Sequence, residues 1–180
     1  MSSGTSRGGC QSAVVIPVPA AEDVVGRWRN EHDPVAAAGV PAHITLVVPW
    51  LPPARIGTAE LDELDGVVKA SPAFDFALTR VGWFGRRVLW LAPEPAEPFR
   101  SLTGLVSEHF GTPPWGDEFD EVVPHLTVGH VACRDGGGDL APVAAALAVR
   151  LPVICRAEQV WVMTGDGSRW TVRHRRDLPA

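Results

Sequence analysis

Two short segments of this chain share one pattern. Residues 41–48 read Pro-Ala-His-Ile-Thr-Leu-Val-Val, and residues 123–130 read Val-Pro-His-Leu-Thr-Val-Gly-His. In each segment a proline precedes a histidine, which is followed by an apolar residue, a threonine and further apolar residues. Short apolar runs rich in β-branched residues, with proline near the start where a missing N–H costs least, are typical of β-strands. The pattern predicts strands over 42–48 and roughly 123–132.

Side chains in a strand alternate between its two faces, and this decides which residues lie together. His43 and Thr45 share one face of the first strand, and His125 and Thr127 share one face of the second. The apolar residues between them point the other way. Each strand therefore presents an imidazole beside a hydroxyl on one face and apolar side chains on the opposite face, its apolar back. Because the copies lie in different halves of the chain, they predict two similar halves that each contribute one strand to a shared cleft.

With these two His-x-Thr motifs the sequence resembles the two-histidine (2H) phosphoesterase superfamily, and most of all its 2'-5' RNA ligase-like and cyclic phosphodiesterase branch. The resemblance implies an α+β, bilobal, pseudo-two-fold fold, in which helices flank two antiparallel sheets around a central cleft. It implies that His43 and His125 are catalytic, that Thr45 and Thr127 bind phosphate, and that no cofactor takes part. The alternative is two ordinary strands that each happen to carry a histidine.

The chemistry of phosphodiester cleavage suits these residues. Without a metal, the reaction needs a base for the nucleophile, an acid for the leaving oxygen and donors for the phosphoryl oxygens. Histidine, with an ordinary pKa of about 6.5, can serve as either acid or base. A strained 2',3'-cyclic phosphate is a natural substrate, and the reverse reaction would be a 2'-5' ligation. By the resemblance, His125 is the base and His43 the acid, but the two motifs are chemically equivalent in the sequence.

Two other functional classes remain open. A metal-dependent hydrolase would need more than the two histidines, and no carboxylate stands at close spacing in either strand, so we predict no metal site. A non-catalytic nucleotide-binding or RNA-binding module could use the same fold. Phosphate-binding glycine motifs of other nucleotide folds are absent from the sequence. His130 is five residues from His125, so strict alternation predicts that it faces away from the cleft.

Length and composition bound the remaining possibilities. A chain of 180 residues predicts a single domain over 12–180, after a disordered N-terminus at 1–11. The net charge of −5 argues against coating long nucleic acid and favours a small nucleotide or short RNA partner with a 2',3'-cyclic phosphate or a 2'-5' linkage. The three scattered cysteines fit a reduced cytoplasm, and the lack of a long apolar run predicts no membrane partner. We also expect a monomer.

Hydrophobic periodicity and turn residues predict the other elements. We expect helices at 22–32, from about 58 to 68, at 99–110 and at 140–149, strands at 12–18, 74–84, 88–91 and 169–175, and one long or bent strand spanning 151–163. Aromatic and basic residues near the motif strands are candidates for substrate contact, or else ordinary packing and solvated residues. These candidates are Trp50, Trp83, Phe84, Arg86 and Trp115.

Overall fold

A computed structural model describes residues 10–114, 122–131 and 139–180 of the protein. The strands are β1 (Gln11–Pro17), β2 (His43–Val47), β3 (Phe74–Phe84), β4 (Val88–Glu94), β5 (Leu126–His130), β6 (Val153–Ala157), β7 (Gln159–Gly165) and β8 (Trp170–Asp177). The helices are α1 (Glu22–His32), α2 (Pro34–Ala37), α3 (Thr58–Val68), α4 (Glu97–Phe110) and α5 (Ala141–Ala148), with short 3-10 turns at Pro19–Ala21 and Pro53–Arg55. No helix in these ranges is both long and apolar enough to cross a membrane.

The described strands form two four-stranded sheets, ordered β2-β1-β7-β8 and β5-β4-β3-β6. Every pairing between them is antiparallel. In each sheet an inner strand leads through a helix to the edge strand beside it, as β1-α1-β2 in one sheet and β4-α4-β5 in the other. The two motif segments therefore occupy equivalent edges of two similar halves, which confirms the predicted α+β fold.

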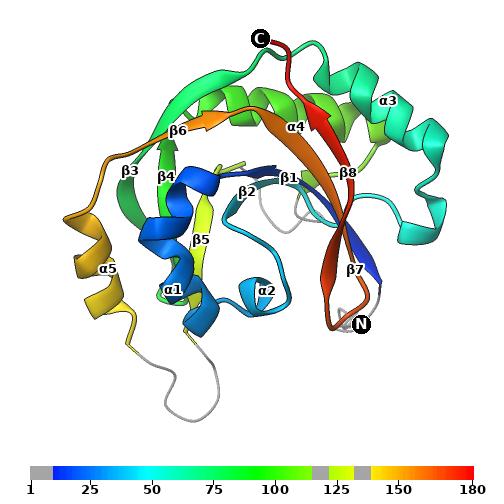
Figure 1. Ribbon diagram of the computed structural model, residues 1–180. Helices are drawn as coiled ribbons and strands as arrows, with labels where there is room; N and C mark the ends of the chain where they lie inside the picture. Colours follow the sequence, from blue (N-terminus) through cyan, green and yellow to red (C-terminus); the bar gives the residue numbers. More distant parts are fainter. Residues whose placement is uncertain (1–9, 115–121, 132–138) are drawn as a thin grey trace.

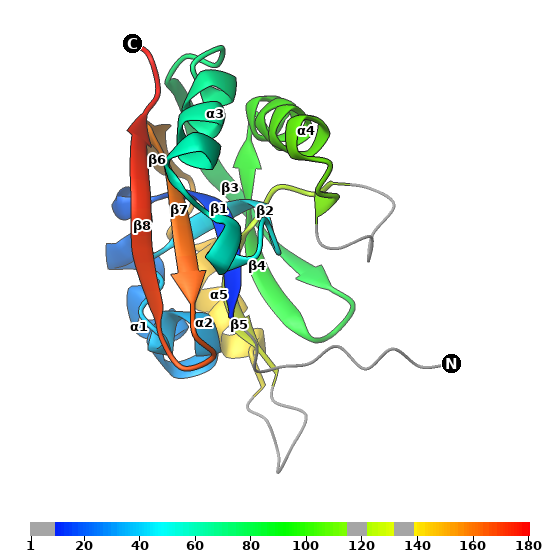
Figure 2. The same ribbon diagram turned by 90° about the vertical axis from the view of Figure 1, so that its right-hand side faces the viewer.

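The helices cross between the two halves (Figure 1). Helix α1 follows β1 but packs against β5 of the other sheet, and α4 follows β4 but packs against β2. The edge strands β2 and β5 also contact each other. In the view turned by 90°, α3 and α4 remain at the top of the molecule and α1, α2 and α5 at the bottom (Figure 2). This crossed packing brings the motif strands together.

The apolar backs of both motif strands lie in the main core. Ile44 and Leu46 of β2, and Leu126 and Val128 of β5, are fully buried. A second, smaller apolar cluster lies on the opposite face of β1, built around Ala13, Val15, Val40 and Met163. Because Val14 and Ile16 of β1 belong to the main core, β1 is buried on both faces. The strand thus reads as a continuous apolar run.

The structure corrects two predictions about the elements. The single strand predicted over 151–163 is two strands in different sheets, since β6 pairs with β3 and β7 pairs with β1. The chain passes from one sheet to the other at Glu158. The apolar pattern on either side of this residue does not show which strand each segment pairs with. Gln11, predicted to be disordered, is the first residue of β1, while residues 1–9 lie outside the described ranges.

Candidate active site

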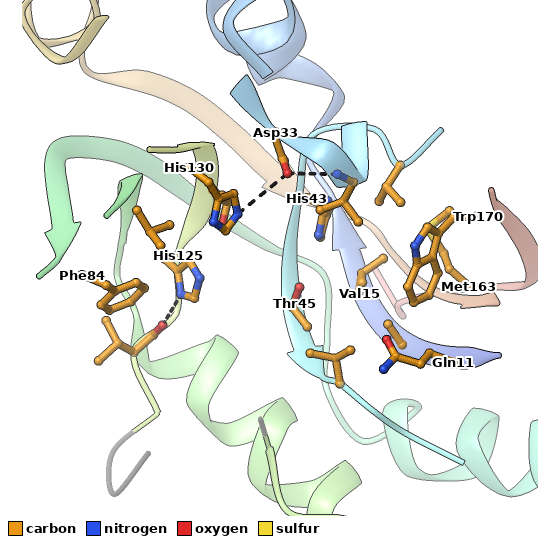
Figure 3. Close-up of a pocket in the computed structure, with 17 residues that line it drawn as sticks. Gln11, Val15, Asp33, His43, Thr45, Phe84, His125, His130, Met163 and Trp170 are labelled. Atoms are coloured by element: carbon orange, nitrogen blue, oxygen red, sulfur yellow. Dashed lines mark hydrogen bonds and ion pairs between the residues drawn. The ribbon is translucent and has the colours of Figure 1, made fainter. Parts of the chain in front are cut away.

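A cavity of about 360 Å³ lies where the two motif strands meet. His43 and Thr45 line it from β2, and Thr127 lines it from β5. His125, the residue just before β5, also lines it. The close-up shows His43, Thr45 and His125 turned toward a common space (Figure 3). All four residues of the two His-x-Thr motifs thus line one cavity, as the alternation of side chains predicted.

Both histidine rings are held in the same way. Nδ1 of His43 lies 2.7 Å from the carbonyl oxygen of Pro41, and Nδ1 of His125 lies 2.7 Å from that of Val123. A carbonyl oxygen can only accept, so Nδ1 carries the proton in both rings. The neutral rings then carry their lone pairs at Nε2, the atom that can take a proton from a nucleophile or, once protonated, give one to a leaving group.

The surroundings of both rings disfavour the charged form when no ligand is bound. Burial, followed by the nearby Arg29 guanidinium, lowers the pKa of His43 to about 4. Burial also lowers the pKa of His125, and the charge of His130 lowers it further. An anionic phosphate between the rings would favour their charged forms and act in the opposite direction. Protonation of the site is therefore coupled to the arrival of an anion.

Arg29 of α1 ties the two motif strands together. Its side chain is only 2% exposed. Nε donates to the Thr127 carbonyl oxygen at 3.1 Å, and one terminal nitrogen donates to the Val40 carbonyl oxygen at 3.2 Å. The other terminal nitrogen lies 2.9 Å from the Asp33 carboxylate. One buried guanidinium thus holds β5, the segment that leads into β2, and the end of its own helix.

Asp33 connects this buried pair to the cavity. Its second carboxylate oxygen accepts a hydrogen bond from the Val35 amide at 3.2 Å, which caps the start of α2. The same oxygen lies 3.9 Å from Nε2 of His130. Asp33 and His130 both line the cavity (Figure 3). Sequence reasoning missed Arg29 and Asp33, although their spacing of four residues at a helix end was a signal for an ion pair.

The prediction that His130 faces away from the cleft is wrong. In the pairing of β5 with β4, Thr127 lies opposite Trp90 and Gly129 lies opposite Leu89, so Val128 is an extra residue. A bulge of this kind shifts the alternation by one residue. His130 therefore returns to the face of Thr127, and its side chain is 45% exposed at the cavity.

The other candidate residues separate into four groups. Phe84 lines the cavity, with its ring edge-to-face with His125 at 4.7 Å and stacked with Trp90 at 5.0 Å. Trp50 is a correction, because it is only 3% exposed and packs in the core against Phe110.

Trp83 and Arg86 are exposed on the β3–β4 hairpin but do not belong to the described lining of the cavity. Trp115 lies outside the described residues. Within those residues no group of three or more His, Cys, Asp or Glu is arranged to hold a metal ion.

A two-lobed α+β fold with one His-x-Thr strand from each lobe at a shared cavity is the architecture that the sequence resemblance implied. A family model described as the 2'-5' RNA ligase superfamily matches residues 16–169. The chain therefore belongs to the 2'-5' RNA ligase superfamily, and the resemblance drawn from the two motifs is confirmed. No curated protein matches the chain.

Solved structures of similar fold cover almost the whole chain. E. coli LigT complexed with phosphate is 18% identical with a TM-score of 0.57, over 96% of this chain and 99% of LigT. E. coli LigT complexed with 3'-AMP is 18% identical with a TM-score of 0.58, over 94% and 98%. The protein TT0787 of Thermus thermophilus is 19% identical with a TM-score of 0.56, over 93% and 97%. At these identities the likeness shows the fold.

Proposed function

We propose that the protein is a metal-independent phosphoesterase that opens 2',3'-cyclic phosphates at RNA ends or on small nucleotides, with 2'-5' ligation as the reverse reaction. The observation that carries the proposal is the convergence of both His-x-Thr motifs on one cavity, with both rings held by Nδ1. The solved complexes of the LigT fold with phosphate and with 3'-AMP support a ligand of this chemistry.

The proposed reaction divides the work between the two rings. Nε2 of His125 takes a proton from water as the water oxygen forms a bond to phosphorus. Nε2 of His43 gives a proton to the 3'-oxygen as its bond to phosphorus breaks, and the product is a 2'-phosphate. His125 then gives its extra proton to solvent, and His43 takes up a proton from solvent when the next phosphate binds. A positioned acid or base of this kind contributes about 10²–10⁴-fold to the rate.

The low pKa of His43 is compatible with the role of acid. In the ligand-free cavity Nε2 of His43 carries no proton near neutral pH, because the pKa of the ring is about 4. The negative charge of a bound phosphate favours protonation of the ring. As the bond to phosphorus breaks, the 3'-oxygen becomes more basic, while burial and the neighbouring Arg29 favour the neutral ring. His43 then gives its proton up readily.

A substrate with a leaving group that needs no protonation tests this division of roles. It should rescue the turnover of His43→Ala and leave that of His125→Ala low. Rescue of His125→Ala alone would reverse the two roles. Rescue of neither variant would show that the rings act mainly by holding the phosphate.

Thr45 and Thr127 are proposed to donate hydrogen bonds to the non-bridging phosphate oxygens. Each hydroxyl lies two residues after its histidine on the same face of its strand, and both residues line the cavity. Donors placed where charge develops stabilise the transition state. Thr45→Val and Thr127→Val keep the side-chain shape, so each should lower kcat/KM with little change in thermal stability.

The proposed function is tested with a panel of 2',3'-cyclic nucleotides, cyclic-phosphate RNA ends and 2'-5' dinucleotides, with product analysis in excess EDTA. Formation of 2'-phosphates that persists in EDTA is the expected result. Activity that EDTA abolishes and a divalent ion restores would instead favour a metal-dependent hydrolase. Binding of the panel without any turnover would favour the non-catalytic nucleotide-binding module.

A further inference from the structure

The cavity is longer than a phosphate site requires. Phe84 and His125 lie at one end, Thr45 lies in the middle, and Trp170, Met163 and Gln11 lie at the other end (Figure 3). We name the end bounded by Val15, Met163, Trp170 and Gln11 the apolar arm. Its walls come from β1, β7 and β8 and form part of the second apolar cluster.

The apolar arm is built before any ligand arrives. Trp170 lies opposite Gly165 in the β7–β8 pairing, and a Cβ added at Gly165 would stand 2.7 Å from the indole ring. The glycine therefore lets the ring lie directly over the strand. The Trp170 amide also donates to the Ala38 carbonyl oxygen at 2.8 Å, which fixes the start of β8. A ring held in this way gives a flat surface, and its side chain loses little conformational entropy when a ligand binds.

Charge determines what the arm can hold. The described residues that line the cavity include no Lys or Arg, and the polar ones other than Gln11 gather around the two motifs. A second phosphate in the arm would lose water without gaining a cation, which is costly for a charged group. A flat uncharged group would bury its faces against Val15, Met163 and Trp170, and such burial is favourable.

We propose that the apolar arm is the subsite for the nucleobase of the substrate. This proposal rests on the phosphoesterase function proposed above. With the phosphate between His43 and His125, the arm continues directly from Thr45 along β1, so one cavity accommodates the phosphate and the base attached to the same ribose. Gln11 at the far end carries both a donor and an acceptor for the edge of a base. The enzyme therefore selects nucleoside cyclic phosphates over cyclic phosphates that bear charge in place of a base.

The test compares three substrates that each carry a five-membered cyclic phosphate on a ribose. They are a nucleoside 2',3'-cyclic phosphate, ribose 2',3'-cyclic phosphate without a base, and the cyclic phosphate of ADP-ribose, whose reacting ribose carries a pyrophosphate and no base. The expected kcat/KM is at least about tenfold higher for the nucleoside than for either other substrate, the effect of about 1.4 kcal/mol of selective binding. Equal values for all three would overturn the nucleobase subsite and leave the phosphoesterase function intact. No turnover of any of them, nor of a cyclic-phosphate RNA end, would refute the phosphoesterase function itself.

Variants then assign the preference to the arm. Trp170→Ala should lower kcat/KM for the nucleoside toward the value for the base-free substrate, whereas Trp83→Ala, an exposed tryptophan outside the described cavity lining, should leave the ratio unchanged. Gln11→Lys changes an exposed side chain, so it keeps the test decisive if Trp170→Ala does not fold. It should narrow the preference for the nucleoside over the ADP-ribose substrate. Ratios unchanged in the folded arm variants would overturn the assignment.

Discussion

The buried ion pair of Arg29 and Asp33 makes a quantitative prediction about stability. Arg29→Met keeps most of the side-chain volume and removes the charge. The variant leaves the Asp33 carboxylate, which is fully buried, without its 2.9 Å partner, and it also removes the donors to the carbonyl oxygens of Thr127 and Val40. Breaking a buried pair from one side costs about 3–5 kcal/mol.

The two carbonyl oxygens that lose a donor place the expected loss near the upper end of that range, at about 5 kcal/mol. A typical domain has only about 5–15 kcal/mol of total stability, so the variant should be close to unfolding. Asp33→Asn in the same background removes the uncompensated charge but keeps an oxygen that can cap α2. The double variant should recover part of the loss, with a coupling free energy of about 2 kcal/mol.

Equilibrium urea unfolding of the wild type, both single variants and the double variant measures these free energies. Arg156→Met is the matched control, because Arg156 pairs with Asp75 at 2.7 Å on the exposed surface, and its unfolding free energy should change little. A loss below about 1 kcal/mol for Arg29→Met would refute the argument that the buried guanidinium holds the two strands together.

Three further predictions follow from the site and its supports. The pKa of His43 is about 4 in the folded protein against an ordinary value of 6.5, so the unfolded chain binds the proton first as pH falls. The unfolding free energy should therefore fall as pH drops from 6.5 to 4. In urea titrations, His43→Gln should make the unfolding free energy less dependent on pH in this range. His130→Gln removes a charge that lowers the pKa of His125, so the limb of the kcat/KM pH profile that reports His125 should move to higher pH. The loss of activity should be less than about tenfold. A loss as large as that of a catalytic residue would instead give His130 a direct role. A Cβ at Gly129 would stand 2.6 Å from the Cβ of His32 on α1, whereas a Cβ at Gly66 in α3 would meet no atom within 4 Å. In thermal melts, Gly129→Ala should therefore destabilise the protein by about 1–3 kcal/mol, and Gly66→Ala should stabilise it by about 0.5–1 kcal/mol. Equal shifts for the two variants would contradict the packing of α1 on β5.

Local alternation in the sequence was enough to predict the motif strands. Ile44 and Leu126 face the core while His43 and Thr127 face the cavity, because β2 is regular up to Thr45 and β5 is regular up to Thr127. The same rule failed at His130, since the bulge at Val128 depends on the register with β4. Register against a partner strand is a long-range property that a local pattern does not contain.

The supports of the site were harder to predict than its motifs. Arg29 looks like a solvated helix residue in the sequence, and its burial follows only from the crossed packing of α1 on β5. Trp50 follows a motif strand, which suggested the cleft, yet its side chain turns into the core against Phe110. The apolar arm likewise depends on β1, β7 and β8 meeting in space, so Met163 and Trp170 carried no sequence signal for binding.

The central claim is that His43 and His125 act together on one phosphate in the shared cavity. Its most direct test is kcat/KM on a 2',3'-cyclic nucleotide for His43→Ala, His125→Ala and the double variant, with folding checked by circular dichroism. Each single variant should lose about 10²–10⁴-fold, and the double variant should lose far less than the product of the two losses, because groups that act as a unit are strongly non-additive. Single variants that keep activity near that of the wild type, or losses that multiply fully, would contradict a two-histidine mechanism.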